Sequence, residues 1–136
     1  MSTISSRIIS IYKSRQTILE QLRRQGYNVE DYENFSMNEI DSMWSNSQLD
    51  MLINNKDLDS KIYIKYYFNI KQTTKQIKKE VLDNIIEDLF VIEEVLTKKD
   101  TLIVIIDDEP NDSILTRIKY LYDHDSIFVI IHNIHR

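Results

Sequence analysis

The stretch Thr101–Ile106, TLIVII, is a continuous apolar run dominated by β-branched residues. Such residues favour strands, and a strand without alternating polar positions is typical of a sheet that is covered on both faces. The run therefore predicts a central strand with helices on either side, and the neighbouring segments have to supply that cover.

The segments after this run alternate between helix and strand signals. Asn111 or Asp112 is placed to cap a helix of about Ser113–Tyr122, and Ile127–His132, IFVIIH, reads as a last strand. A strand, a helix and a second strand in this order imply a right-handed crossover and at least one parallel pair.

Two earlier strands are predicted before the central run. Leu49–Ile53 is a short apolar segment, and Lys61–Phe68, KIYIKYYF, is rich in β-branched and aromatic residues. The polar segment between them reads as a turn, so the pair forms a hairpin or meander. Alternation places Ile62 and its i+2 neighbours in the core and Lys61 with its i+2 neighbours on the other face.

Three helices are predicted in the first hundred residues. Arg7–Val29 has apolar residues at helical spacing, and Gly26 follows the last of them at a C-cap position. Ser36 opens a capping box before a short helix at Met37–Trp44. The main packing helix starts at Thr73 or Thr74 and runs to about Leu96, with Ile92 among the apolar positions. Its first turns are crowded with lysines, either facing an anionic partner or simply solvated, at positions Lys71, Lys75, Lys78 and Lys79.

These elements predict a single domain of the α/β class, at the border of α+β, with a four-stranded mixed sheet flanked by helices. The 136 residues are enough for one hydrophobic core, and no apolar run approaches the roughly 20 residues of a membrane span. A net charge of −5 argues against unaided binding to a polyanion. The scarcity of Gly, Pro and Ala indicates an AT-rich genome, such as that of a large DNA virus or a protist.

Several patterns were candidates for chemistry. A restriction-type nuclease needs an acid on one strand and an acid two residues before a lysine on the next, where the carboxylates hold Mg²⁺. Asp50 and Lys65 fit, but Tyr63 stands where the second acid is needed. We expect no catalytic residues from this pattern.

Other polar clusters favour no cofactor and no metal. The acidic run Asp107–Glu109 follows the central strand, where a magnesium site or a solvated loop are the alternatives. His132 and His135, with His124 nearby, have a spacing that serves metal binding only in a helix. The aromatic and basic face of Lys61–Phe68 either stacks single-stranded bases or packs under a helix.

Two short motifs resemble the start of the fifth subunit shared by the eukaryotic nuclear RNA polymerases. They are Arg15-Gln16-Thr17-Ile18 and Gly26-Tyr27-Asn28-Val29, with Gln25 where the family usually has Arg. The order of later elements is similar too: Leu102–Ile106 stands for the family's apolar strand. Glu109-Pro110-Asn111-Asp112 stands in the position of its T-P-S-A loop, of which only Pro110 is kept.

The resemblance implies a fold and a function. Residues 1–136 would correspond to the N-terminal jaw domain, and the family's C-terminal assembly domain would be absent from this chain. The protein would be a non-catalytic polymerase subunit near downstream duplex DNA, in contact with the largest subunit, other polymerase subunits and transcription factors. It would act in the nucleus, or in a virion or cytoplasmic viral factory.

The resemblance and the charge pattern also give candidate contact residues. The loop expected to face DNA comprises Pro110, Asn111, Asp112 and Ser113. The candidates for contact with a partner or a phosphate are Arg7, Lys13, Arg15, Arg23 and Arg24, with part of Arg15 expected inside. The alternatives are an inactive nuclease-like fold and a free-standing interaction adaptor.

Overall fold

The computed structural model describes residues 6–68 and 77–135. The helical elements in chain order are α1 (Ser6–Arg24), α2 (Met37–Ser45), α3 (Lys79–Ile86), the π-helix η1 (Glu87–Ile92) and α4 (Asp112–Asp125). The strands are β1 (Met51–Asn54), β2 (Lys61–Tyr66), β3 (Thr101–Ile106) and β4 (Phe128–Asn133). Each predicted strand is present, with its ends shifted by at most two residues.

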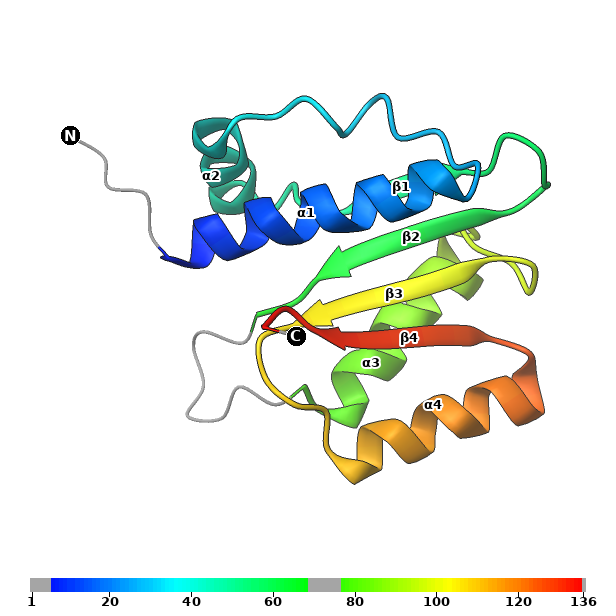
Figure 1. Ribbon diagram of the computed structural model, residues 1–136. Helices are drawn as coiled ribbons and strands as arrows, with labels where there is room; N and C mark the ends of the chain where they lie inside the picture. Colours follow the sequence, from blue (N-terminus) through cyan, green and yellow to red (C-terminus); the bar gives the residue numbers. More distant parts are fainter. Residues whose placement is uncertain (1–5, 69–76, 136) are drawn as a thin grey trace.

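The strands form one mixed sheet in the order β1-β2-β3-β4, as Figure 1 shows. β1 and β2 are antiparallel, with Met51 opposite Ile64. β2 and β3 are parallel, and so are β3 and β4, where Leu102 lies opposite Val129. The predicted four-stranded mixed α/β sheet in a single domain is therefore confirmed.

Two apolar cores lie on opposite faces of this sheet. The first joins α1 and α2 to one face of β1 and β2, and the second joins α3, η1 and α4 to the other face. β3 contributes to both, because Leu102 and Val104 enter the second core whereas Ile105 enters the first, and all three are fully buried. The continuous apolar composition of this strand follows directly from its cover on both faces.

The helix α1 ends as its sequence predicts. Gly26 has φ 94°, a left-handed conformation that costs glycine little, and the Tyr27 amide bonds back to the Leu22 carbonyl at 3.0 Å. The chain then runs beside the outer edge of β1. There the Tyr32 hydroxyl donates to the Leu52 carbonyl and accepts from the Leu52 amide, at 3.2 and 3.1 Å. These contacts cover an edge that would otherwise expose unpaired backbone groups.

The main packing helix differs from its prediction. The described part begins at Lys79, and Thr73 and Thr74 lie outside the described residues. The helix does not continue to Leu96, because it widens into η1, where the Glu93 amide bonds to the Asp88 carbonyl. A π turn holds about one residue more than an α turn, so the 3.6-residue phase is lost. The expected core residue Ile92 is consequently 66% exposed.

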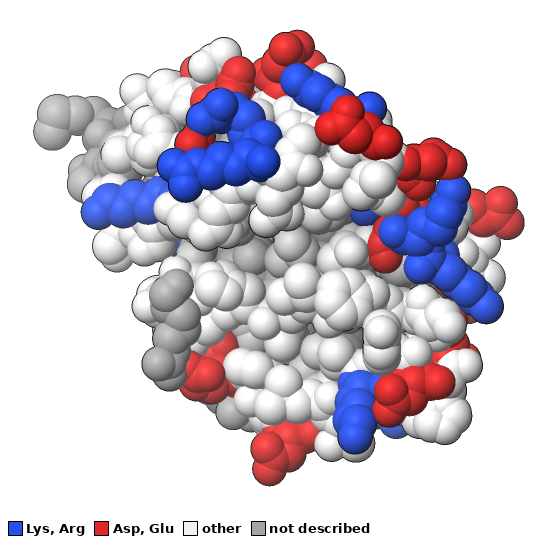
Figure 2. All heavy atoms as spheres, turned by 45° about the vertical axis from the view of Figure 1, so that its right-hand side comes forward, with Lys and Arg blue, Asp and Glu red and all other residues white. Residues whose placement is uncertain are grey.

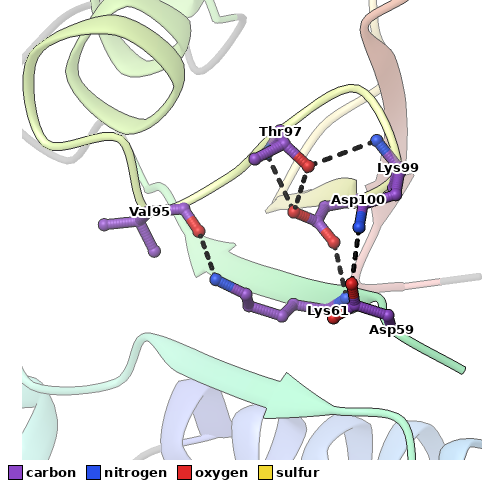
Figure 3. A network of polar contacts seen from close by, with 6 residues as sticks. All are labelled: Asp59, Lys61, Val95, Thr97, Lys99 and Asp100. Carbon is purple, nitrogen blue, oxygen red and sulfur yellow. Dashed lines mark hydrogen bonds and ion pairs between the residues drawn. The ribbon is translucent and has the colours of Figure 1, made fainter.

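A buried aspartate fastens the starts of β2 and β3 together. Asp100 is 3% exposed, and its carboxylate accepts from the Lys61 amide at 2.7 Å. The other oxygen accepts from the amide and the hydroxyl of Thr97 at 2.8 and 3.0 Å. Figure 3 shows Asp100 between these groups, while Asp59 and Lys99 meet on the solvent side of the same network. Asp100 therefore sets where the two parallel strands begin relative to each other.

Replacing Asp100 with Ala should destabilise the fold strongly. The change leaves three donors without their acceptor, one on half-buried Lys61 and two on exposed Thr97, so we expect a loss of about 2 kcal/mol in the free energy of unfolding. Asp59→Ala is the matched control: its carboxylate is exposed and, among the described residues, pairs with Lys99, so the change should affect stability much less. Urea denaturation of both variants measures the difference, and equal effects would show that Asp100 does not fasten the strands.

Candidate functional site

The carboxyl ends of the parallel strands lie at one edge of the sheet, on the left of Figure 1. The segment after β3 begins with Asp107, β4 is followed by Ile134 and His135, and Phe68 follows β2. The first turn of α1 lies beside them, because Ser6, Arg7 and the three segments line one hollow of about 220 Å³. This edge is where open α/β sheets usually place ligands.

Arg7 is held at this edge by three side chains. Its guanidinium pairs with the Asp107 carboxylate at 3.0 Å and lies 4.8 Å from the ring centre of Phe68 and 5.6 Å from that of Trp44. Of the run Asp107–Glu109, Asp107 is 7% exposed and paired with Arg7, whereas Asp108 is half-buried and Glu109 is exposed. Arg7 therefore links α1 to the end of β3, and its charge is already paired with that of Asp107.

The loop predicted to face DNA lies next to the start of α3. Asn111 caps α4 by accepting from the Ile114 amide at 2.9 Å, Pro110 is half-buried, and Asp112 and Ser113 are exposed. A shallow hollow of about 390 Å³ joins this loop to the lysine end of α3; it is lined by Lys79, Asp112, Ser113, Thr116, Arg117 and Tyr120. The lysine end of α3 and the loop after β3, which are about thirty residues apart in the sequence, thus share one surface.

The two basic residues that line this hollow, Lys79 and Arg117, differ in whether an acid pairs with them. Arg117 pairs with Asp83 at 2.9 Å and lies 5.2 Å from the ring centre of Tyr120. Lys79 is exposed and forms no ion pair among the described residues. Because Asp112 lies at the same rim, the local charge is close to balanced, and a phosphate would meet Lys79, the Ser113 hydroxyl and the Thr116 hydroxyl.

The five basic residues predicted for partner contact do not form one patch. Lys13 is exposed midway along α1, whereas Arg23 and Arg24 lie at its carboxyl end and both pair with Glu20. With a rise of 1.5 Å per residue, Arg7 and Arg23 are separated by about 24 Å along the helix axis.

Arg15 has to be removed from the contact set. It is 2% exposed, and its guanidinium donates to the Leu49 carbonyl at 2.8 Å on the inner side of α1. Two of its nitrogens, Nε and Nη2, are buried without a hydrogen-bond partner, and burial lowers its pKa. The side chain lies on the apolar stripe, where it fastens α1 to the segment before β1 instead of facing a partner.

The residues of the broken nuclease pattern meet on the hairpin of β1 and β2. The Asp50 carboxylate accepts from the Tyr63 hydroxyl at 2.8 Å and pairs with Lys65 at 3.1 Å, through the same oxygen. Burial, and then the bond to Asp50, raise the pKa of Tyr63 well above its ordinary value. The phenol therefore stays a neutral donor and supplies no metal ligand.

The hairpin presents one carboxylate where the nuclease pattern needs two. A two-carboxylate metal site needs a second anionic oxygen near Asp50, and Tyr63 places a hydroxyl proton there instead. The described residues contain no group of three or more His, Asp or Glu side chains arranged to hold a metal ion. Tyr63 and Tyr67 also pack against the second core, which favours the structural interpretation of this aromatic face over base stacking.

The sequence did not predict that Lys13 would lie near two of the histidines. His132 and His135 share a hollow with Lys13, whereas His124 stacks on Tyr120 at 4.1 Å on α4. The sequence marks Lys13 and the two histidines separately, and only the register of β4 against β3 and the position of α1 bring them together.

No protein-family model matches the chain, and no curated protein matches it. None of the described helices is both long and apolar enough to cross a membrane.

Replacing Tyr63 with Glu should create a divalent cation site. The new carboxylate would lie beside Asp50, and we expect Mn²⁺ binding with a dissociation constant of about 10⁻³ M, the weak end of protein carboxylate sites. Isothermal titration calorimetry measures it. The double variant Tyr63→Glu, Asp50→Asn is the control and should lose the binding; equal Mn²⁺ affinity in the unchanged protein and in Tyr63→Glu would show that Tyr63 does not silence the site.

Proposed function

We propose that this chain is a non-catalytic subunit domain of a DNA-dependent RNA polymerase, similar to the jaw domain of the fifth shared subunit. The observation that carries the proposal is the order of elements around the two α1 motifs. A strand pair, a helix, an apolar strand, a loop with Pro110, a helix and a closing strand follow α1 and α2 in the order that the resemblance implies.

Residues of both motifs make contacts that link α1 to the β1 region, and these contacts support the resemblance. Arg15 is the buried member of the first motif and bonds to the Leu49 carbonyl. Gly26 of the second motif takes a positive φ, and Tyr27 starts the segment that covers β1 through a bridge to Asn55. Each motif therefore joins α1 to the β1 region, so a related fold would need the same residue types at these positions.

The charge distribution favours an assembled role over unaided DNA binding. Phosphate contacts supply most of the affinity of proteins for DNA, and a net charge of −5 works against such contacts. Lys79, Ser113 and Thr116 offer a small local contact at the Pro110–Ser113 loop. Such a contact suits a domain that a larger complex holds beside downstream DNA.

The chain also offers a surface for protein partners. Apolar side chains are exposed along α4 and β4, where Tyr122 is 59%, Phe128 43% and Ile130 40% exposed. Apolar residues gathered on one side of a small domain often mark a protein interface. In this proposal they contact the largest polymerase subunit, another subunit or a transcription factor.

A second function has one observation in its favour. The contact of Asp50 with Tyr63 and Lys65 places a nuclease-type arrangement on the hairpin with one acid replaced. That arrangement fits an inactive nuclease-like fold that acts as a free-standing interaction adaptor. The two functions differ in their partner.

An affinity pull-down of the full-length gene product from its native cells or virions separates them. The polymerase proposal predicts that both large polymerase subunits are recovered in stoichiometric amounts, from nuclei or from virions and viral factories. Recovery of an unrelated protein in place of those subunits would contradict the proposal and favour the adaptor.

A further inference from the structure

The polar face of α1 and the carboxyl end of β4 enclose a hollow of about 380 Å³. It lies beside the Arg7–Asp107 pair and shares Ser10, Ile134 and His135 with the hollow there. Its described lining contains no Asp or Glu; the residues are Ser10, Lys13, Ser14, Thr17, Ile18, His132, Ile134 and His135.

The α1 wall of this hollow is a stripe of hydroxyls around one lysine. Ser10, Lys13 and Thr17 are spaced i, i+3 and i+7, so they lie on one side of the helix. Ser14 belongs to the same stripe and is bonded to the Tyr66 hydroxyl at 3.0 Å. Lys13 is exposed and forms no ion pair among the described residues, so its charge is not neutralised locally.

The opposite wall carries two titratable groups. His132 is half-buried near the end of β4, and His135 follows in the turn after it. Asp107 lines the adjoining hollow and pairs with Arg7 through Oδ2, and Glu109 accepts from the Asn133 amide group at 3.2 Å. The histidines and Lys13 therefore face each other across hydroxyl groups without an opposing carboxylate in the lining.

We infer that this hollow binds a phosphate group, either free or in a nucleic-acid backbone. Lys13 supplies a permanent positive charge, and the hydroxyls of Ser10 and Thr17 are donors for phosphate oxygens. Each histidine adds a ring N–H donor for a phosphate oxygen.

The hollow continues into space for the rest of a phosphorylated ligand. Thr17, Ile18 and His132 also line a neighbouring hollow of about 500 Å³ that extends over Ile103, Phe128 and Ile130. Its described lining has no Lys, Arg, Asp or Glu, and Figure 2 shows a hollowed, uncharged band across the molecule with charged side chains on its rims. A phosphate at the polar end would leave an attached apolar or planar group on this uncharged surface.

The inference goes beyond the polymerase proposal and does not rest on it. The isolated chain should bind phosphate whether or not it enters a polymerase. If phosphate binding failed while the pull-down recovered the large polymerase subunits, only the phosphate site would be wrong. Phosphate binding without recovery of those subunits would support the phosphate site and contradict the polymerase proposal.

Nuclear magnetic resonance of the histidine side chains tests the site, because the chain has three histidines and only two line the hollow. Added inorganic phosphate should shift the imidazole signals of His132 and His135 and leave those of His124 unchanged. Equal shifts of all three histidines, or no shift at phosphate concentrations up to about a hundred times those of the protein, would overturn the inference.

Charge-matched variants complete the test. Lys13→Gln should weaken phosphate binding by about tenfold, the worth of one charged hydrogen bond, whereas Lys119→Gln on the exposed side of α4 should not change it. Equal affinity in the two variants would contradict the site. A short oligothymidine identifies the source: shifts of the same two histidines at lower concentration than inorganic phosphate support a nucleic-acid backbone, and shifts with inorganic phosphate alone support a free phosphate.

Discussion

The whole structure depends on β3 being buried on both faces. Its alternate side chains enter two separate cores, and Leu102, Val104 and Ile105 have no exposed surface. At roughly 25 cal/mol per Å² of apolar surface, a strand covered twice gains more from burial than an edge strand does. It also requires helices on both sides. The two crossover connections supply α3, η1 and α4 on one face, and α1 and α2, which precede the sheet in the chain, cover the other.

The same constraint places the polar groups. Because β2, β3 and β4 are parallel, the segments after them meet at one edge, where the start of α1 also lies. The Arg7–Asp107 pair joins α1 to the end of β3 at this edge. The DNA-facing loop of the polymerase proposal and the phosphate-binding hollow are both at this end of the molecule, connected by the contact between Glu109 and Asn133. At the opposite end of these strands, Asp100 links the start of β3 to the start of β2.

Local signals made much of the fold predictable. The apolar run of β3, the capping box at Ser36 and the positive φ of Gly26 each depend on a few neighbouring residues, and all three are found as predicted. The exposure of Ile92 was not predictable, because a π turn has no comparable local signature. The burial of Arg15 was expected only in part, since its partner is a carbonyl 34 residues away. The candidate site was the hardest part to predict, because Lys13 and the two histidines come together only in the folded chain, where they line one hollow between α1 and the end of β4.

The most direct test of the polymerase account is site-specific photo-cross-linking. A photoreactive amino acid at Ser113, in the loop after β3, would be compared with one at Lys98, which is exposed in the turn before the same strand. In transcribing complexes isolated from the native source, the account predicts a cross-link to downstream duplex DNA from position 113 and none from position 98. Equal cross-linking from both positions, or none from either in complexes that contain the chain, would contradict the account.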